Sequence, residues 1–444
     1  MKTIKHIFAF LLALLLLQEL RAQQPLSMTE ALSLARANNP ILKESALEVQ
    51  KTGSERVIAR SYFLPTVYAG AQANHYFQLP AFFGFGENSE GGKIPYGRFG
   101  GDDQLSASIT AIQPLYNPLA YPTYRHAQLR QQETALTARA EEIAVLAQVK
   151  DTYLRVLVLQ ERIRLTRESI NRNQKVLQDS RLLFLQGKGL RVDTLRAYTS
   201  VKNLEPDLVK LTFAVETGKL ELKSLIGIES PETFVLTDSL EVPVPEKIPG
   251  EEVVYDEVIT NNPEFQVLKL RTQLEQENVR VASAHRKPSV ALVGQYQVQS
   301  QTNELEYGSA HYPTSSFVGL QLSVPLFTGL SAQARVKQAS LSAEQSGLEV
   351  NRVRAQLKAR VHDAIAKNRE SLLRLETTAI VEETAQVSYD IIQYRYKNGI
   401  SPRLELTDAE LALSTAQSNY LEAVYDYLSA RIELRKLTGV KETE

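Results

Sequence analysis

The sequence predicts a mostly α-helical, internally duplicated chain. Its four strands belong to a membrane β-barrel, and its long helices form two hairpins. Three observations predict this fold class. Motifs recur in one order about 220 residues apart, four segments alternate between apolar and polar side chains, and two spans of more than 70 residues lack proline.

Composition excludes several classes of protein. The 444 residues are 43% hydrophobic and 23% charged, with 50 basic and 51 acidic side chains. This much apolar surface at so small a net charge excludes intrinsic disorder. A nucleic-acid-binding domain is not expected either, because it needs an excess of basic residues. Since the chain has no cysteine, disulfides, zinc–thiolate sites and thiol nucleophiles are excluded.

Residues 1–22 are expected to be a secretory signal peptide. Lys2 and Lys5 precede an apolar run from Ile7 to Leu17, and Ala22 provides a cleavage site. A helix of that run is roughly 16 Å long, which is too short for a bilayer core of about 30 Å. We therefore expect the protein to be exported.

The mature chain contains one unit twice, over 23–227 and 251–439. Asn38-Asn39-Pro40 recurs as Asn261-Asn262-Pro263, and Leu225-Ile226-Gly227 recurs as Leu437-Thr438-Gly439. The offset falls from 223 residues at the first pair to 212 at the second. The first copy therefore holds about twelve extra residues, which we place in a loop near 77–101 because loops tolerate insertions. Segment 228–250 is expected to link the copies, and 440–444 to form a C-terminal tail.

Each copy carries two alternating segments, which are predicted to be strands. They cover about 65–76 and 103–115 in the first copy, and about 288–299 and 315–327 in the second. A segment of about ten residues with one apolar and one polar face is typical of a membrane barrel strand. A soluble antiparallel sheet with one solvated face would show the same pattern. Ten of the 33 aromatic residues fall between Tyr62 and Phe99, which favours a barrel with an interfacial aromatic girdle.

The remaining spans predict long helices. Helices are expected over about 119–185 and about 330–397, in spans rich in Ala, Leu, Gln, Glu and Arg. Each would be roughly 100 Å long, whereas an ordinary globular helix has about a dozen residues. Tip turns at 186–193 and 398–405 then reverse the chain into helices that end near 226 and 437. Each copy is therefore expected to hold one long helical hairpin.

Four strands are too few to close a membrane barrel. Unpaired backbone groups cannot face lipid, and the smallest closed barrels have about eight strands. Two chains would supply eight strands around a filled interior, whereas three chains would supply twelve strands around a lumen. We therefore expect several chains to share one barrel and to gather their helices into a hollow tube.

The whole mature chain resembles the TolC-type outer-membrane efflux proteins (the outer membrane factor family). The most specific part of the resemblance is the pair of tip turns. Phe184-Leu185-Gln186-Gly187 leads to Asp193, and Tyr396-Lys397-Asn398-Gly399 leads to Glu405. The resemblance implies a homotrimer with a shared twelve-stranded barrel, a helical tunnel, and a belt formed partly by 228–250. The proline-rich stretch with Pro243, Pro245 and Pro249 suits that belt.

The resemblance also implies a function and partners. The chain would be the outer-membrane channel of a tripartite efflux or type I secretion system, with its helical tunnel in the periplasm. It would act as a passive conduit, coupled through a periplasmic adaptor protein to an inner-membrane pump. Its partners would be copies of itself, the adaptor, the pump and outer-membrane lipid, without nucleic acid or a cofactor. A periplasmic adaptor, or a structural or adhesive trimer on the cell surface, remains an alternative.

The resemblance places a constriction and an adaptor contact at the tip turns. The constriction residues matched here are Asp193, Glu405, Asp408 and Tyr396. Ser401 stands where the family has an arginine, so Arg403 or Arg191 is expected to replace it. The adaptor contact is expected at Gly187, Gly399, Leu190 and Ser401. A purely structural interpretation is also open for some of these, because acids stabilise helix starts and glycines stop helices.

No catalytic or metal-binding motif stands out. The six histidines are scattered, and the chain contains neither a HExxH pair, a GxSxG elbow nor a P-loop. The Gly84, Gly86, Gly91 and Gly92 cluster does not match a dinucleotide fingerprint. We therefore predict that the chain is not an enzyme and holds neither a metal nor a cofactor.

Overall fold

The computed structural model describes residues 24–84, 94, 96–228, 234–240, 249–303 and 310–439. The predicted signal peptide and C-terminal tail lie outside these residues, as do Gly86, Pro243 and Pro245. The chain divides into two compact units. One comprises Met1–Val49, Thr134–Leu268 and Val350–Glu444, and the other comprises Gln50–Glu133 and Lys269–Glu349.

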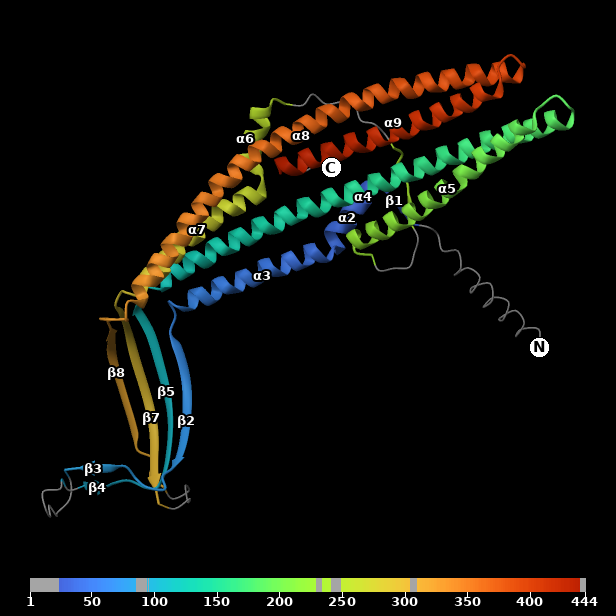
Figure 1. The fold of residues 1–444 in the computed structure, drawn as a ribbon. Coiled ribbons are helices and arrows are strands. Elements are labelled where there is room, and N and C mark those ends of the chain that lie inside the picture. The colour runs from blue at the N-terminus through green and yellow to red at the C-terminus, as the bar shows by residue number, and fades with distance from the viewer. Residues whose placement is uncertain are drawn as a thin grey trace, which may run out of the picture. The chain divides into compact units, whose positions relative to one another are not determined.

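A four-stranded antiparallel sheet dominates the second of these units (Figure 1). Its strands are β2 (Thr66–His75), β5 (Asp103–Tyr116), β7 (Ser289–Thr302) and β8 (Thr314–Ser323), in the order β2-β5-β7-β8. The two inner strands come from different copies of the repeat. The sheet therefore joins the two copies side by side.

The register of the sheet aligns the alternation of all four strands. Ile109 of β5 lies opposite Ala69 on β2 and Tyr296 on β7. The next residue, Ser108, lies opposite Gly70 and Gln297. Because directly opposed residues share a face, one face collects most of the apolar side chains and the other most of the Ser, Thr and Gln, although Tyr68 and Phe317 lie on the polar face. The sheet thus has the two faces that the alternation predicts.

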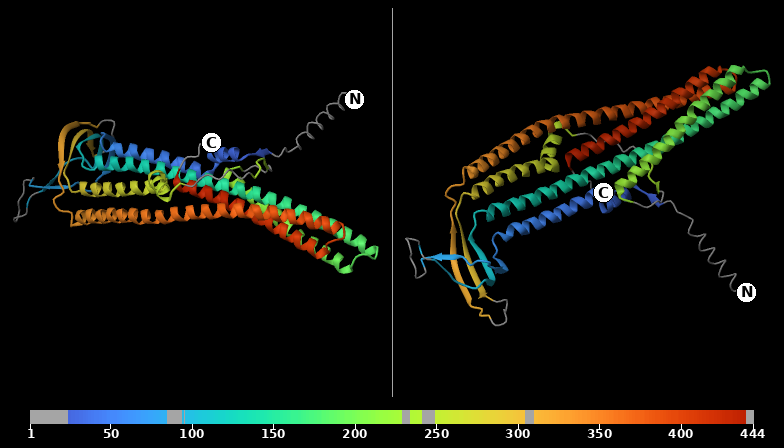
Figure 2. Two further views of the ribbon diagram at one scale, coloured as in Figure 1. Left: turned by 90° about the horizontal axis from the view of Figure 1, so that it is seen from above. Right: turned by 60° about the horizontal axis from the view of Figure 1, so that its bottom comes forward.

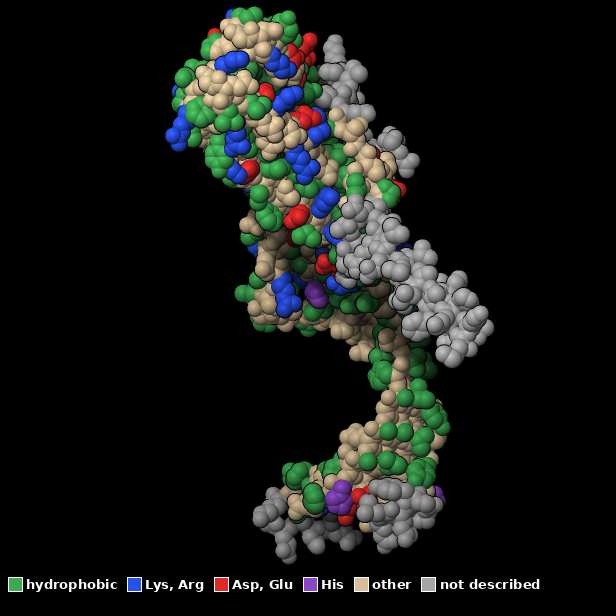
Figure 3. Space-filling view, turned by 90° about the vertical axis from the view of Figure 1, so that its right-hand side faces the viewer, with side chains coloured by type: hydrophobic (Ala, Val, Ile, Leu, Met, Phe, Trp, Pro, Cys, Tyr) green, Lys and Arg blue, Asp and Glu red, His purple; other side chains and the backbone are tan. Residues whose placement is uncertain are grey.

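Charged side chains are almost absent from this sheet. β2, β7 and β8 contain no Asp, Glu, Lys or Arg, and β5 has only Asp103, at its first residue. On the face shown in Figure 3, hydrophobic and uncharged side chains cover the strands, in the lower part of the view. Ile109, Val318 and Leu320 on the apolar face are each more than half exposed in the single chain. Such a face needs an apolar surrounding.

The extra residues of the first copy contain a short hairpin instead of the plain loop expected near 77–101. Its strands are β3 (Ala81–Phe83) and β4 (Tyr96–Arg98), which pair in antiparallel fashion. Phe82 packs near Phe99, and Phe83 packs near Tyr96, with ring centroids 6.2 and 6.1 Å apart. Four of the aromatic residues expected to form the interfacial girdle therefore lie in this hairpin or directly after it.

The other unit is built mainly from four long helices. They are α4 (Ala120–Leu185), α5 (Arg191–Ile226), α8 (Ser331–Lys397) and α9 (Arg403–Thr438), of which α4 and α8 also extend into the sheet-containing unit. α4 and α5 form one hairpin, and α8 and α9 form the other (Figures 1 and 2). None of the helices in the described ranges combines the length and apolarity needed to cross a membrane.

Shorter helices precede each strand pair. α2 (Met28–Asn38) and α3 (Pro40–Ser61) belong to the first copy, and α6 (Glu251–Asn261) and α7 (Pro263–Ala284) to the second. Asn39 and Asn262 each interrupt what would otherwise be one helix. Each asparagine accepts a hydrogen bond from the backbone of the following helix through its Oδ1 atom, from Ile41 N at 2.8 Å and from Phe265 N at 2.9 Å.

The recurring motifs contact one another in both copies. Asn39 Nδ2 donates to the carbonyl of Leu225 at 2.7 Å, and Asn262 Nδ2 donates to the carbonyl of Leu437 at 2.9 Å. The glycines that follow, Gly227 and Gly439, end α5 and α9 in the left-handed conformation, with φ of 69° and 68°. The motifs that revealed the duplication therefore form one clamp per copy.

A two-stranded parallel sheet completes this unit. β1 (Gln24–Leu26) pairs with β6 (Phe234–Leu236), a strand inside the predicted linker 228–250. Tyr153 of α4 is fully buried, and its hydroxyl donates to the Leu26 carbonyl at 2.8 Å and to Asp238 at 3.0 Å. This contact holds both strands against α4 and the main hydrophobic core.

Candidate functional site

The tip turns have the same local structure in both hairpins. Gly187 and Gly399 adopt φ of 69° and 68°. In each turn the glycine N–H bonds to the carbonyl three residues earlier, and the following N–H bonds to the carbonyl five residues earlier. This is a Schellman ending, which requires a left-handed residue. Both predicted tip glycines therefore stop a helix.

Asp193 and Glu405 occupy equivalent places after these turns. α5 begins at Arg191 and α9 at Arg403, so each acid is the third residue of its helix. Neither helix start has a capping side chain on the preceding residue, Leu190 or Pro402. The acids therefore face uncapped helix starts, where negative charge is favourable. This structural role is compatible with a further role at a constriction.

Arg403 joins the two hairpins at the tip. Its side chain is only 7% exposed, and Nη1 donates to Ser180 Oγ at 2.5 Å and to the backbone carbonyl of Asp193 at 2.6 Å. Burial lowers the pKa of Arg403, while the neighbouring Tyr396 and Asp193 oppose that shift. A guanidinium keeps its charge at any physiological pH, so this contact remains charge-assisted.

The other predicted constriction residues differ in how far their side chains are exposed. Tyr396 is half-buried and packs on the cluster that contains Tyr389 and Leu406. Glu405, Asp408 and Arg191 are exposed, and within the described part of the chain their side chains form neither a hydrogen bond nor an ion pair. The structure therefore brings Asp193, Tyr396 and Arg403 together, and leaves the other three at the surface of the single chain.

The predicted adaptor residues differ in accessibility. Leu190 is 66% exposed and the two glycines are exposed. Ser401, by contrast, is only 7% exposed, and its hydroxyl is buried without a hydrogen-bond partner in the described residues. In the single chain Ser401 is therefore much less accessible than the other three residues of the predicted adaptor contact, which stays a prediction. Its neighbour Ile400, 62% exposed, is available there instead.

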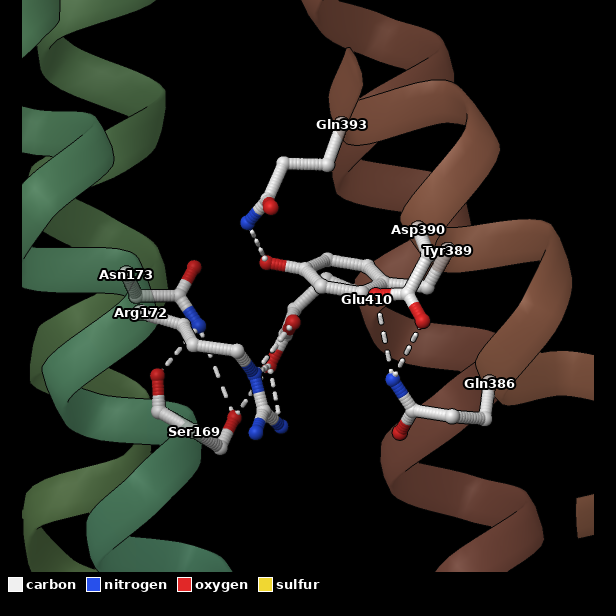
Figure 4. Close-up of polar contacts among 8 residues, drawn as sticks. All are labelled: Ser169, Arg172, Asn173, Gln386, Tyr389, Asp390, Gln393 and Glu410. Carbon is white, nitrogen blue, oxygen red and sulfur yellow. Dashed lines mark hydrogen bonds and ion pairs between the residues drawn. The ribbon is translucent and has the colours of Figure 1, made fainter.

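A buried ion pair between the hairpins was not predicted from the sequence. Glu410 of α9 accepts hydrogen bonds from Arg172 of α4 at 2.9 to 3.1 Å and from Ser169 Oγ at 2.7 Å (Figure 4). The Arg172 guanidinium lies 5.6 Å from the centre of the Tyr389 ring, and Gln393 donates to the Tyr389 hydroxyl at 2.8 Å. The cluster therefore connects α4, α8 and α9.

A third polar contact connects α4 and α9 further from the tip. Asp151 accepts hydrogen bonds from Tyr425 at 3.0 Å and from Ser429 at 2.7 Å. Burial and the Asp151 charge raise the pKa of Tyr425 to about 12. The hairpins are thus joined at Asp151, at Glu410 and at Arg403. No group of three or more His, Cys, Asp or Glu residues within the described ranges is placed to hold a metal ion.

Comparisons with known proteins agree with this architecture. A family model described as outer membrane efflux protein matches residues 31–228 and 254–440. The alkaline protease secretion protein AprF of Pseudomonas aeruginosa is 25% identical over 341 residues, which cover 76% of this chain and 70% of AprF. The outer membrane protein TolC of Vibrio cholerae is 21% identical over 421 residues, covering 93% and 90%.

Solved structures show the same fold. The outer-membrane channel OprN superimposes with a TM-score of 0.76 at 16% identity, covering 93% of this chain and 89% of OprN. The open state of the Neisseria gonorrhoeae MtrE outer membrane channel gives 0.73 at 18% identity, covering 93% and 88%. AprF is described as a secretion protein and OprN and MtrE as outer-membrane channels, and none of the relatives named here is described as an enzyme. The chain therefore belongs to the outer membrane efflux protein family, the outer-membrane ducts of efflux and secretion systems.

Proposed function

We propose that the chain is one subunit of a homotrimeric duct that connects, through a periplasmic adaptor, to an inner-membrane pump. The open edges of the four-stranded sheet carry this proposal. Within the described sheet, β2 and β8 each pair on one side only. An unpaired edge in hydrocarbon costs several kcal/mol for each polar group, so both edges need partners.

Three copies satisfy these edges and leave a passage. Two copies would give eight strands, whose interior side chains fill. Three copies give twelve strands, with the Ser, Thr and Gln face toward the lumen and the apolar face toward lipid. The uncharged polar face, which includes Ser108 and Gln297, suits a water-filled lumen.

Native mass spectrometry of the protein extracted in a non-ionic detergent tests the assembly. We expect a species with three times the mass of the denatured chain. A stable monomer or dimer as the main species would contradict the proposal. Heating in SDS should convert the assembled species to the single chain, because barrel closure and not a covalent bond holds it together.

We further propose that the tip is a gate held closed by Arg403. Its two hydrogen bonds tie the start of α9 to α4 and α5. Three-fold rings of Asp193, Glu405 and Asp408 would then favour cations at the constriction. The exposed apolar side chains Leu190 and Ile400 are proposed to contact the adaptor.

Arg403→Ala tests the gate by planar-bilayer conductance. A hydrogen bond to a charged group contributes about 1.5 to 3 kcal/mol, and 1.4 kcal/mol is a tenfold change in an equilibrium constant. We therefore expect the ratio of open to closed channels to rise at least about tenfold. Arg191→Ala is the matched control, because Arg191 has the same charge at the same tip but is exposed and forms neither a hydrogen bond nor an ion pair within the described residues. Equal conductance of the two variants would remove the role proposed for Arg403.

The acidic residues have a separate test. Asp193→Ala combined with Glu405→Ala should raise the leak conductance and reduce selectivity for cations, because two carboxylates per subunit leave the constriction. Unchanged conductance and selectivity would exclude these acids from the gate while leaving the channel itself intact.

A further inference from the structure

Two buried polar atoms at the start of α9 have no hydrogen-bond partner within the described residues. They are the hydroxyl oxygen of Ser401 and the Nε atom of Arg403. Both side chains belong to residues that are only 7% exposed. Buried polar groups are nearly always hydrogen-bonded, and an exception in a folded protein can act as a store of strain. The two atoms lie in the contact that joins the hairpins at the tip.

The place of Ser401 relative to α9 explains why its hydroxyl is unpaired. A serine at the N-cap of a helix accepts a hydrogen bond from a backbone N–H of the first turn. In α9 the N-cap is Pro402, and this helix start has no side-chain cap. Ser401 lies one residue before the cap, so its hydroxyl and the first turn of α9 do not satisfy each other.

The first hairpin shows that the turn itself does not require unpaired atoms. Its tip turn ends α4 in the same way, with a left-handed glycine and the same pair of backbone hydrogen bonds. Gly189 stands there in the place of Ser401, and Arg191 stands in the place of Arg403 and is exposed. The unpaired atoms are therefore specific to the hairpin whose arginine contacts the other one.

A second buried serine in the same contact is fully paired. Ser180 of α4 is 3% exposed. Its Oγ atom accepts the hydrogen bond from Arg403 Nη1 at 2.5 Å and donates to the carbonyl of Val176 at 2.8 Å. One contact thus holds one buried hydroxyl that both donates and accepts, and another that does neither within the described residues.

The two serines should therefore act on this contact in opposite directions. Separation of the hairpins exposes both hydroxyls to water, which can hydrogen-bond to either one. For Ser401 this removes the desolvation penalty of an unsatisfied buried group, whereas for Ser180 it replaces a hydrogen bond to a charged donor. Ser401 thus favours separation, and Ser180 favours contact.

We propose that the unpaired atoms of Ser401 and Arg403 keep the closed tip only marginally more stable than the open tip. This inference rests on the gate proposed above, in which Arg403 holds the tip closed. The same contact that closes the tip buries polar atoms that opening hydrates. A partner that binds the open tip then needs less differential binding free energy to shift the equilibrium.

Two alanine substitutions test the proposal in opposite directions. Hydrogen–deuterium exchange of the assembled protein in a non-ionic detergent measures how often the first turns of α9 open. Ser401→Ala removes the unpaired hydroxyl and should slow exchange there at least about fivefold. Ser180→Ala removes an acceptor of Arg403 and should accelerate exchange at least about fivefold. Conductance in planar bilayers should fall in the first variant and rise in the second.

Ser388→Ala is the matched control for both substitutions. Ser388 lies on α8 of the same hairpin, is exposed, and forms no hydrogen bond through its side chain in the described part of the chain. Its replacement removes a hydroxyl that is already hydrated in the closed state. Exchange at the start of α9 and the conductance should therefore stay at the wild-type level.

The signs of the two effects decide the outcome. The proposal is overturned if Ser401→Ala leaves the exchange unchanged or accelerates it, or if both serine variants shift it in the same direction. Arg403→Ala distinguishes this failure from a failure of the gate. If Arg403→Ala raises the conductance but Ser401→Ala has no effect, the gate stands and the marginal stability is excluded. If Arg403→Ala leaves the conductance unchanged, the gate itself fails, and this inference fails with it.

Discussion

Glu410 lies on the apolar face of α9, with Leu406 one turn before it and Leu413 almost one turn after it. All three side chains are buried, Glu410 at 8% exposure. A carboxylate in such a place is tolerated only when it is paired and hydrogen-bonded. Arg172 and Ser169 meet this requirement from α4. The hairpins are therefore held together by an ion pair in which neither buried charge is tolerated without its counter-charge.

This mutual dependence predicts a clear pattern in a double-mutant cycle. Glu410→Ala should lower the free energy of unfolding by about 3 kcal/mol, because it leaves a half-buried guanidinium without its partner. Replacing both residues, with Arg172→Met and Glu410→Leu, should cost less than either single change, since no charge then remains buried. Thermal unfolding followed by circular dichroism measures the order of the variants.

The control for this cycle is Glu405→Ala, which removes an exposed acid on the same helix and should change the melting temperature little. Additive effects of the Arg172 and Glu410 substitutions would contradict the coupling. Such additivity would mean that the two side chains contribute independently, whatever their distance.

Individual contacts were predicted less well than residue types. The sequence indicated Asp193 and Arg403 as tip residues, but Arg403 bonds to the backbone carbonyl of Asp193 and not to its carboxylate. Glu410 was missed, although its place between Leu406 and Leu413 in a helical period marks it as a charge on a buried stripe. Its partner Arg172 is 238 residues away in the sequence, and the pattern within one helix carries no information about such a partner.

At the scale of elements, four glycines with the same backbone conformation differ in their surroundings. Gly187 and Gly399 at the tips, and Gly227 and Gly439 at the clamps, all have φ between 68° and 69°. A Cβ added at either tip glycine would meet no atom within 4 Å. At Gly227 it would lie 2.5 Å from the Asn38 carbonyl oxygen, and at Gly439 2.7 Å from that of Asn261.

Alanine substitutions should therefore separate backbone strain from steric overlap. Gly187→Ala and Gly399→Ala should each cost about 1 to 2 kcal/mol, the penalty of a left-handed L-residue. Gly227→Ala and Gly439→Ala carry the same penalty plus the cost of overpacking, about 1 to 3 kcal/mol more. Melting temperatures of the four variants give the comparison. Equal losses at all four positions would show that the clamp backbone moves freely to accommodate a methyl group.

The elements that sequence reasoning anticipated are those with long, regular patterns. α4 covers Ala120–Leu185 and β7 covers Ser289–Thr302, where helix-forming composition and alternation extend over many residues. The short strands β1, β3, β4 and β6 have three residues each, too few for any period to show. β1 and β6 are also joined by tertiary contacts, such as the Tyr153 hydroxyl on Leu26, which no local pattern encodes.

At the scale of the whole molecule, the apolar face of the sheet requires an apolar surrounding. The register gathers most apolar side chains of the four strands on one face and most polar side chains on the other, with Gln295 opposite Phe317 among the exceptions. The fold class was predictable because this alternation is present in each segment separately. The pairing of β5 with β7 across the two copies was not, since strand order depends on assembly and not on local pattern.

The face assignment leads to a prediction from two adjacent residues of β5. Ile109 lies on the apolar face and Ser108 on the polar face, each opposite residues of its own kind. A lysine on the lipid face of a barrel costs about 2 to 4 kcal/mol near the bilayer midplane, whereas substitutions on the lumen face alter selectivity. Ile109→Lys should therefore reduce the amount of assembled, SDS-resistant protein in outer membranes. Ser108→Lys should leave assembly intact and shift the reversal potential toward anions, because it adds positive charge around the lumen. The opposite outcome, with Ser108→Lys blocking assembly and Ile109→Lys changing selectivity, would mean that the polar face meets the lipid.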